Sequence, residues 1–91
     1  FISEIAPNEY IVEGSTNLDD LNDRLDLDLS SEDYDSLGGF IIERLDRLPE
    51  VGDHITTEDG IRMIVEKLDK NRIERVHLYL PEKVEDPDEE E

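Results

Sequence analysis

The chain has 91 residues, of which 35% are apolar and 40% charged, and its formal net charge is −18. A chain of this length forms one modest core and has no room for a second domain or a deep enclosed cavity. The negative charge repels nucleic-acid phosphates and anionic membrane surfaces, so neither is expected as a partner. Solubility alone explains such a charge, and cations or basic protein surfaces are the electrostatic partners that it favours.

Cysteine is absent from the sequence, which excludes disulfides, thiolate metal sites and cysteine nucleophiles. The longest apolar runs, such as "FII" at residues 40–42, are far too short to cross a bilayer, so no direct membrane insertion is expected. The chain begins at Phe1 without a basic leader segment. We therefore expect a fragment of a longer protein, with residues 1–6 as a linker.

The first elements predicted are a short strand and a short helix. "EYIVEG", residues 9–14, alternates in polarity as a partly covered strand does, and Gly14 ends it. Ser15 or Thr16 is predicted to cap the helix that follows by accepting a free backbone N–H. The helix has one narrow apolar stripe, formed by Leu18, Leu21 and Leu25, and is therefore expected to lie on the surface of the domain.

A second helix is predicted with more apolar character. Asp35 or Ser36 can cap it, and Pro49 is expected to end it. At 100° per residue its apolar positions fall within about 80° of arc. These positions are Tyr34, Leu37, Ile41, Leu45 and Leu48.

Two adjacent glycines open this helix, although glycine costs a helix interior roughly 1 kcal/mol relative to alanine. Gly38 falls inside the apolar arc, where it would let the backbone approach a neighbouring element. Gly39 falls on the polar arc, where it would leave bare backbone for another chain, a neighbouring segment or a small ligand. Free N–H groups of a first helical turn can hold an anion, but Asp33 and Asp35 disfavour a phosphate.

The remaining sequence is rich in β signals. A weak strand at residues 54–60 precedes two alternating strands, "IRMIVEKL" and "IERVHLYL", which "DKNR" joins as an antiparallel hairpin. Residues 81–91 are strongly acidic and are expected to be a disordered tail. The resulting order, β-α-α-β-β-β, predicts an α+β fold with two helices packed on one face of a mostly antiparallel sheet.

No catalytic arrangement of side chains is apparent, so we do not expect an enzyme or a cofactor. His77 projects from a strand beside Arg75 and Tyr79, where a histidine is usually a surface residue. No carboxylate spacing fits a specific metal site, and the acidic tail would gather divalent cations only weakly. We interpret the face near Gly39, Arg75, His77 and Tyr79 as the candidate contact surface, with Gly38 beside Gly39 as the place for a ligand.

Three stretches together resemble the CorC/HlyC transporter-associated domain. They are "YIVEGSTNLDDLNDRLDLDL", "EDYDSLGGFIIERLDRLPEVGD" and "DGIRMIVEKLDKNRIERVHLYL". The combination of "GSTNLDDLN", "YDSLGGFI" and "LPEVGD" carries the resemblance, which extends over residues 7–80. Ser36 stands where threonine is common in that family, and this chain is more acidic than is usual there.

The resemblance implies a fold similar to the small half of flavin-binding oxidoreductase domains, without implying that flavin binds. It also implies a regulatory, non-catalytic domain of a membrane cation transporter, of the Mg²⁺/Co²⁺ efflux or hemolysin-like kind. Such a domain follows a transmembrane domain and a pair of CBS domains at the cytoplasmic face of the membrane, and these would be its partners. A homodimer and a small-ligand sensor, for a nucleotide or a cation, remain open alternatives.

Overall fold

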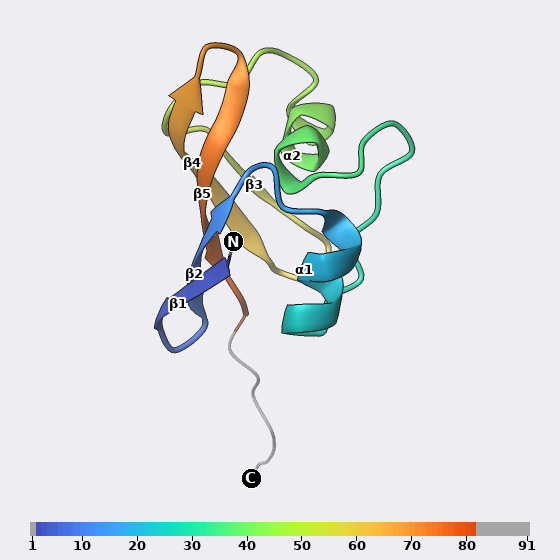
Figure 1. The fold of residues 1–91 in the computed structure, drawn as a ribbon, viewed down its shortest axis with the longest axis vertical. Helices are drawn as coiled ribbons and strands as arrows, with labels where there is room; N and C mark the ends of the chain where they lie inside the picture. Colours follow the sequence, from blue (N-terminus) through green and yellow to red (C-terminus); the bar gives the residue numbers. More distant parts are fainter. Residues whose placement is uncertain (1, 82–91) are drawn as a thin grey trace, which may run out of the picture.

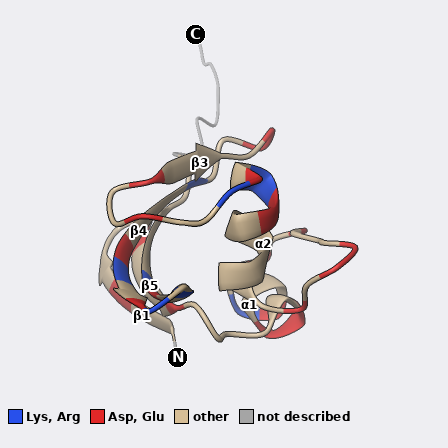
Figure 2. Cartoon of the chain, turned by 90° about the horizontal axis from the view of Figure 1, so that it is seen from above, with Lys and Arg blue, Asp and Glu red and all other residues tan. Residues whose placement is uncertain are grey.

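The computed structural model describes residues 2–81, which form a five-stranded sheet and two helices. The elements are β1 (Ile2–Ala6), β2 (Glu9–Glu13), α1 (Leu18–Leu25), α2 (Leu37–Leu45), β3 (His54–Thr56), β4 (Arg62–Asp69) and β5 (Arg72–Tyr79). Every strand pair is antiparallel, and the strand order across the sheet is β1-β2-β5-β4-β3. Both helices lie on one side of the curved sheet (Figures 1 and 2). The predicted α+β fold is therefore confirmed, and its order β-α-α-β-β-β is the run from β2 to β5.

The N-terminal segment differs from the linker that we expected at residues 1–6. Residues 2–6 form β1, an edge strand paired with β2 through the register Ile2 to Val12 and Ser3 to Ile11. Asn8 has φ = 65°, a left-handed conformation that asparagine tolerates, and it lets the chain reverse between the two strands. Residue 1 and residues 82–91 of the acidic tail predicted at residues 81–91 lie outside the described part of the chain.

One continuous core lies between the helices and the sheet. The alternation predicted for the last two strands is confirmed where they pair most regularly, because Met63 and Val65 of β4 and Val76 and Leu78 of β5 are buried there, whereas the residues between them are not. Leu29, from the long connection between the helices, also joins the core. The buried core residues are Val12, Leu18, Leu21, Leu29, Leu37, Phe40, Ile41, Ile61, Met63, Val65, Ile73, Val76 and Leu78.

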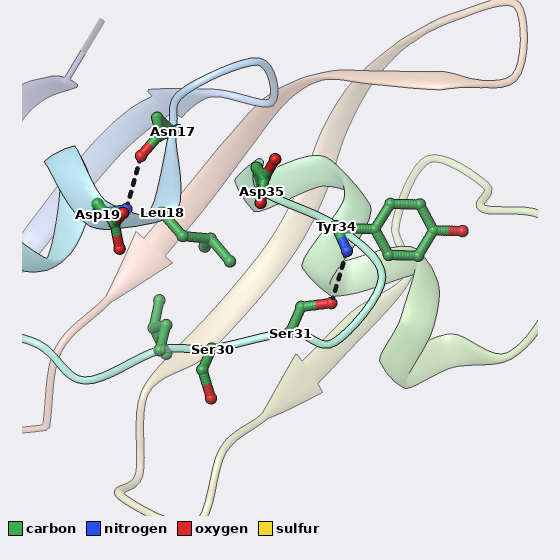
Figure 3. A pocket seen from close by; sticks show the side chains of 8 residues that line it. Asn17, Leu18, Asp19, Ser30, Ser31, Tyr34 and Asp35 are labelled. Carbon is green, nitrogen blue, oxygen red and sulfur yellow. Dashed lines mark hydrogen bonds between the residues drawn. The ribbon is translucent and has the colours of Figure 1, made fainter.

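Helix α1 begins later than the sequence suggested, because Asn17 caps it in place of Ser15 or Thr16. The Asn17 Oδ1 atom accepts a hydrogen bond from the backbone N–H of Asp19 at 2.8 Å (Figure 3). It also accepts one from the N–H of Asp20 at 3.4 Å. Thr16 is still in the preceding turn, where its N–H donates to the Glu13 carbonyl at 3.0 Å. The helix ends at Asp26, which has φ = 58°.

Helix α2 is capped by Ser36, as predicted, whose Oγ accepts from the Gly39 N–H at 3.2 Å. The helix ends at Asp46, which adopts φ = 57° three residues before Pro49. The predicted stripe is consequently too long: Tyr34 and Leu48 lie beyond the helix and are 39% and 67% exposed. Phe40, which the stripe omitted, is fully buried.

The β4–β5 hairpin is tighter than the four-residue link that we predicted. The strands extend to Asp69 and Arg72, so that only Lys70 and Asn71 form the turn. Lys70 takes φ = 60° in this turn. The two strands gain length because backbone pairing continues through residues whose side chains are polar and exposed.

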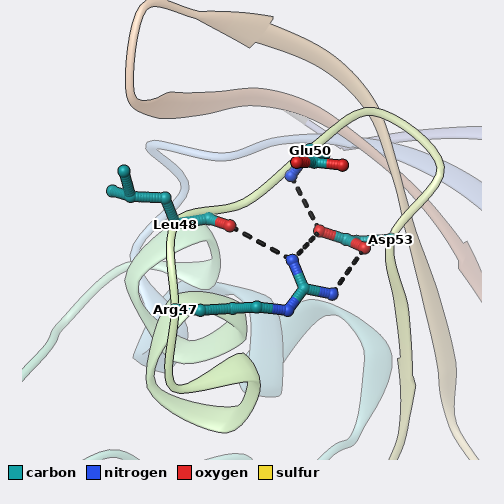
Figure 4. Close-up of polar contacts among 4 residues, drawn as sticks. All are labelled: Arg47, Leu48, Glu50 and Asp53. Carbon is teal, nitrogen blue, oxygen red and sulfur yellow. Dashed lines mark hydrogen bonds and ion pairs between the residues drawn. The ribbon is translucent and has the colours of Figure 1, made fainter.

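An ion pair fixes the loop between α2 and β3 (Figure 4). The Arg47 guanidinium donates to both carboxylate oxygens of Asp53 at 2.8 Å, and the Glu50 N–H donates to Asp53 Oδ2 at 2.7 Å. The hydrogen bond from Arg47, and then that from Glu50, lower the pKa of Asp53 below its ordinary value. The two ends of this loop are thus held together by a bidentate, charge-assisted contact.

Candidate functional site

The face of the sheet opposite the helices is not covered by any element of residues 2–81 (Figure 2). Successive residues of a strand point to opposite faces, so the outward residues follow from the register of the strands. Ile11, His77 and Ile64 stand side by side across β2, β5 and β4, and all three are half-buried. We call this surface the outer sheet face, and this row forms its centre.

His77 is held at this centre by three neighbours. Its Nδ1 lies 3.0 Å from Glu66 Oε2, and its Nε2 lies 3.2 Å from Glu9 Oε1. The Tyr79 ring stacks on the imidazole with centroids 4.3 Å apart and the planes at 3°. An imidazole with hydrogens on both nitrogens can donate to both carboxylates, whereas a neutral ring can donate to only one. The His77 side chain is only 15% exposed, so these contacts fix its orientation.

Charged side chains surround this centre on the same face. Arg75 is exposed and stands opposite Glu13 on β2 and Lys67 on β4, while Arg62 stands opposite Tyr79. A half-buried, partly apolar centre within a polar rim is an arrangement found where one protein surface docks on another. The outer sheet face is therefore chemically suited to a protein contact.

The five residues proposed from the sequence do not lie together. Arg75, His77 and Tyr79 share the outer sheet face, whereas Gly38 and Gly39 are buried on the helical side. A Cβ atom at Gly38 would lie 3.1 Å from the Gly14 carbonyl oxygen and 3.3 Å from Ile73 Cβ, so the close packing that we expected there is present.

Gly39 does not expose bare backbone, contrary to our expectation. A Cβ atom added at this position would overlap the ring of Tyr34, which lies on the helix at this point. Helical-wheel geometry placed Gly39 on the polar side, but the loop before the helix folds back and covers it. The neighbour that needs this glycine is a segment of the same chain.

The first turn of α1 borders a small polar hollow of about 120 Å³ (Figure 3). Asp19 and Asp35 contribute carboxylates to its lining, and Ser31 turns its Oγ toward the Tyr34 N–H at 3.1 Å. Across residues 2–81, no three side chains of His, Cys, Asp and Glu are grouped so that they could hold a metal ion. Neither α1 nor α2 is long and apolar enough to cross a membrane.

The sequence alone did not identify four members of the outer sheet face, which are Glu9, Ile11, Ile64 and Glu66. The signal lay in the register of the strands, because Ile64 and His77 stand opposite each other when the β4–β5 hairpin is closed at residues 70–71. Glu9 could not have been found in this way, since it lies 68 residues before His77 and the pairing of β2 with β5 is not encoded locally.

The fold and this face describe a small α+β domain with one helical layer and a free sheet surface. A sequence model of the CorC/HlyC family, described as a transporter associated domain, matches residues 3–82. The chain belongs to this family.

Proteins of known name share this domain as one part of a longer chain. The magnesium and cobalt efflux protein CorC of Salmonella typhimurium is 27% identical over 79 residues, which are 87% of this chain and 27% of that protein. A protein of Synechocystis, UPF0053 protein sll0260, is 36% identical over 78 residues, which are 80% of this chain and 17% of that protein. The chain therefore spans about a quarter or less of these relatives.

Solved structures have the same fold. The transporter associated domain of a CBS domain protein from Porphyromonas gingivalis is 30% identical, with a TM-score of 0.78 over 89% of this chain and 98% of that one. A CorC_HlyC domain of a Xylella fastidiosa hemolysin, solved in complex with Mg++ and Mn++, has a TM-score of 0.76 at 21% identity, over 89% and 98% of the two chains.

Proposed function

We propose that this domain is a non-catalytic regulatory module of a membrane cation transporter, of the magnesium and cobalt efflux or hemolysin-like kind. It modulates ion transport through contacts with neighbouring domains or subunits of its parent protein, on the cytoplasmic side. The mechanism is a population shift, in which the domain contacts one state of the transporter more favourably than another and so stabilises that state.

The observation that carries this proposal is the uncovered outer sheet face. Its centre holds half-buried Ile11 and Ile64 on either side of His77, rather than the fully polar side chains of a solvated sheet. The membership of the chain in a transporter-associated family, together with relatives several times longer, supplies the parent protein that such a face would contact.

A small-ligand sensor is the second candidate, and one observation favours it. The Xylella fastidiosa domain of the same fold was solved with Mg++ and Mn++. In the present chain the buried glycine pair offers no exposed backbone for a nucleotide, and the described carboxylates form no metal-binding group. A melting temperature that rises with Mg²⁺, Mn²⁺, Co²⁺ or adenine nucleotides would favour the sensor, because a ligand of the native state stabilises it.

A charge reversal within the full-length parent protein tests the regulatory proposal. Arg75→Glu changes the rim of the outer sheet face without altering the core, because Arg75 is exposed. We expect cobalt tolerance or cation efflux of cells carrying this variant to change severalfold, in line with contact energies of about 1 kcal/mol or more.

The matched control is Arg24→Glu, an exposed arginine of α1 on the helical side that undergoes the same change of charge. Transport that is unchanged by Arg75→Glu, or changed equally by both substitutions at equal protein abundance, would contradict a role for this face.

A further inference from the structure

A second surface, separate from the outer sheet face, lies where the C-terminal end of α1 meets the end of β5. An open groove of about 770 Å³ runs between this end of the helix, the β3–β4 loop and the β1–β2 turn. The end of α1, the β1–β2 turn and the end of β5 lie at the same end of the molecule (Figure 1). We call it the α1 groove, and it is defined by Leu25, Leu27, Leu80, Asp26, Asp28 and Asp59.

The floor of the α1 groove is apolar. Leu25, Leu27 and Leu80 are each half-buried, and they pack against the core without being enclosed by it. Ile61 lies beneath them and is fully buried. The groove therefore offers unfilled apolar surface that an apolar side chain of a partner could cover.

All charged residues at the described rim of the groove are acidic, and Asn8 and Pro81 are its uncharged members. Asp26, Asp28 and Asp59 are exposed, and within residues 2–81 none of their carboxylates makes a hydrogen bond or an ion pair. Lysine and arginine are absent from its described lining. Arg24 is the basic residue in the last turn of α1, but it lines a different hollow, together with Asp20 and Asp23.

The helix adds to this negative field. Asp26 occupies the C-cap of α1, where the free carbonyl groups form the negative end of the helix dipole and an acidic residue is electrostatically unfavourable. A cation bound at the groove would relieve the repulsion among these groups. The chain also continues from Pro81 with seven acidic residues and one lysine in ten, so its own following segment has the wrong charge to be the occupant.

We infer that the α1 groove is a docking site for a basic amphipathic polypeptide segment, whose apolar side chains cover the leucine floor while its lysines or arginines meet the aspartate rim. The charge of the rim excludes anionic lipid surfaces and nucleic acids as occupants. This inference goes beyond the proposed regulatory role and does not depend on the outer sheet face.

The test uses the 91-residue chain and synthetic peptides of equal length. The first peptide consists of Lys and Leu arranged amphipathically, the second replaces Lys by Glu, and the third replaces Leu by Ser. Backbone amide NMR shifts of the labelled chain report where each peptide binds. We expect the Lys/Leu peptide to shift amides of residues 25–28, 59–61 and 80, and to bind more tightly than either of the other two.

Two triple variants separate the groove from general electrostatic attraction. Asp26→Asn/Asp28→Asn/Asp59→Asn removes the rim charges and is expected to weaken the Lys/Leu peptide about tenfold, since three exposed charge contacts are lost. The control removes the same number of charges elsewhere, in Asp33→Asn/Asp46→Asn/Asp69→Asn, and should weaken binding by no more than about twofold. Asp46 matches Asp26 because each is a helix C-cap residue in the left-handed conformation, with φ = 57° and 58° respectively.

Three results would overturn the inference. They are equal weakening by both triple variants, amide shifts that cluster outside the groove, and binding of the Lys/Ser or Glu/Leu peptide as tight as that of the Lys/Leu peptide. Amide shifts at the groove that depend on protein concentration without any peptide would instead assign it to a second copy of the chain, and would also overturn the inference.

Discussion

At the scale of single residues, Gly39 is constrained by the aromatic ring that lies on it. Gly39→Ala would raise helix propensity but would force the added methyl group into the Tyr34 ring. Because such overpacking costs more than the propensity returns, we expect a net loss of stability of about 1 kcal/mol. Chemical denaturation measures this loss.

Asp23→Ala in α1 is the control for this substitution, because its side chain is exposed and an added helix former meets nothing there. It should change stability by less than about 0.5 kcal/mol. If Gly39→Ala proved as stable as the parent chain, the Tyr34 ring would not lie against the helix as described.

The contribution of Asp53 to the stability of the fold is expected to depend on pH. Its pKa in the folded chain is lowered, first by the hydrogen bond from Arg47, so the folded state favours the carboxylate more than the unfolded state does. The stabilisation is fully present well above the ordinary pKa of about 4 and is lost as pH falls through the lower folded value. The parent chain should therefore melt at a higher temperature than Asp53→Asn, by a constant difference near neutral pH. This difference should shrink as pH falls below about 4.

The control for this pH series is Glu58→Gln, because Glu58 is exposed and forms no ion pair with Arg47 or with any other basic side chain of residues 2–81. Its difference from the parent chain should be small at every pH. A difference for Asp53→Asn that widens on acidification would mean that the Arg47–Asp53 pair does not stabilise the fold.

At the scale of elements, the start of α1 distinguishes two possible caps. Asn17 accepts hydrogen bonds from the first helical turn, whereas Ser15, which the sequence suggested, does not. We expect Asn17→Ala to lower the free energy of unfolding by about 1 kcal/mol and Ser15→Ala to change it by a few tenths. A larger loss of unfolding free energy for Ser15→Ala than for Asn17→Ala, measured by denaturant titration, would indicate that Ser15 caps the helix.

The elements that the sequence predicted well were those with a strong local pattern. The second helix and the β4–β5 hairpin have apolar periods of 3.6 and 2, and both were found. Strand β1 was missed because "ISEIA" has a weak alternation, and it becomes a strand by pairing with β2. The apolar stripe predicted up to Leu48 was too long because the helix ends at Asp46. Asp46 adopts a left-handed conformation there, which its residue type alone does not predict.

The candidate site was predicted in part for the same reason. Arg75, His77 and Tyr79 alternate along one strand, so their common face follows from local geometry. The partners of His77 come from two other strands, and Gly39 is covered by a loop. Contacts of that kind depend on tertiary packing, which a helical wheel or a single strand pattern does not contain.

At the scale of the whole molecule, the one-sided arrangement determines what the domain can do. Both helices protect one face of the sheet, and the hydrophobic core lies between the helices and that face. The opposite face keeps half-buried apolar side chains within a charged rim, and a groove at one end of the molecule adds an acidic rim over leucines. Under the function proposed here, a domain built in this way acts by contact, and its strong negative charge favours basic surfaces as partners.

Site-specific photo-cross-linking in the full-length parent protein tests the central claim most directly. A photoreactive residue replaces Tyr79 on the outer sheet face and, in a second variant, Arg24 on the helical side. We expect position 79 to cross-link to another domain or subunit of the transporter and position 24 to give little product. Cross-linking from position 24 alone, or none from position 79 at full abundance of the folded protein, would contradict the account.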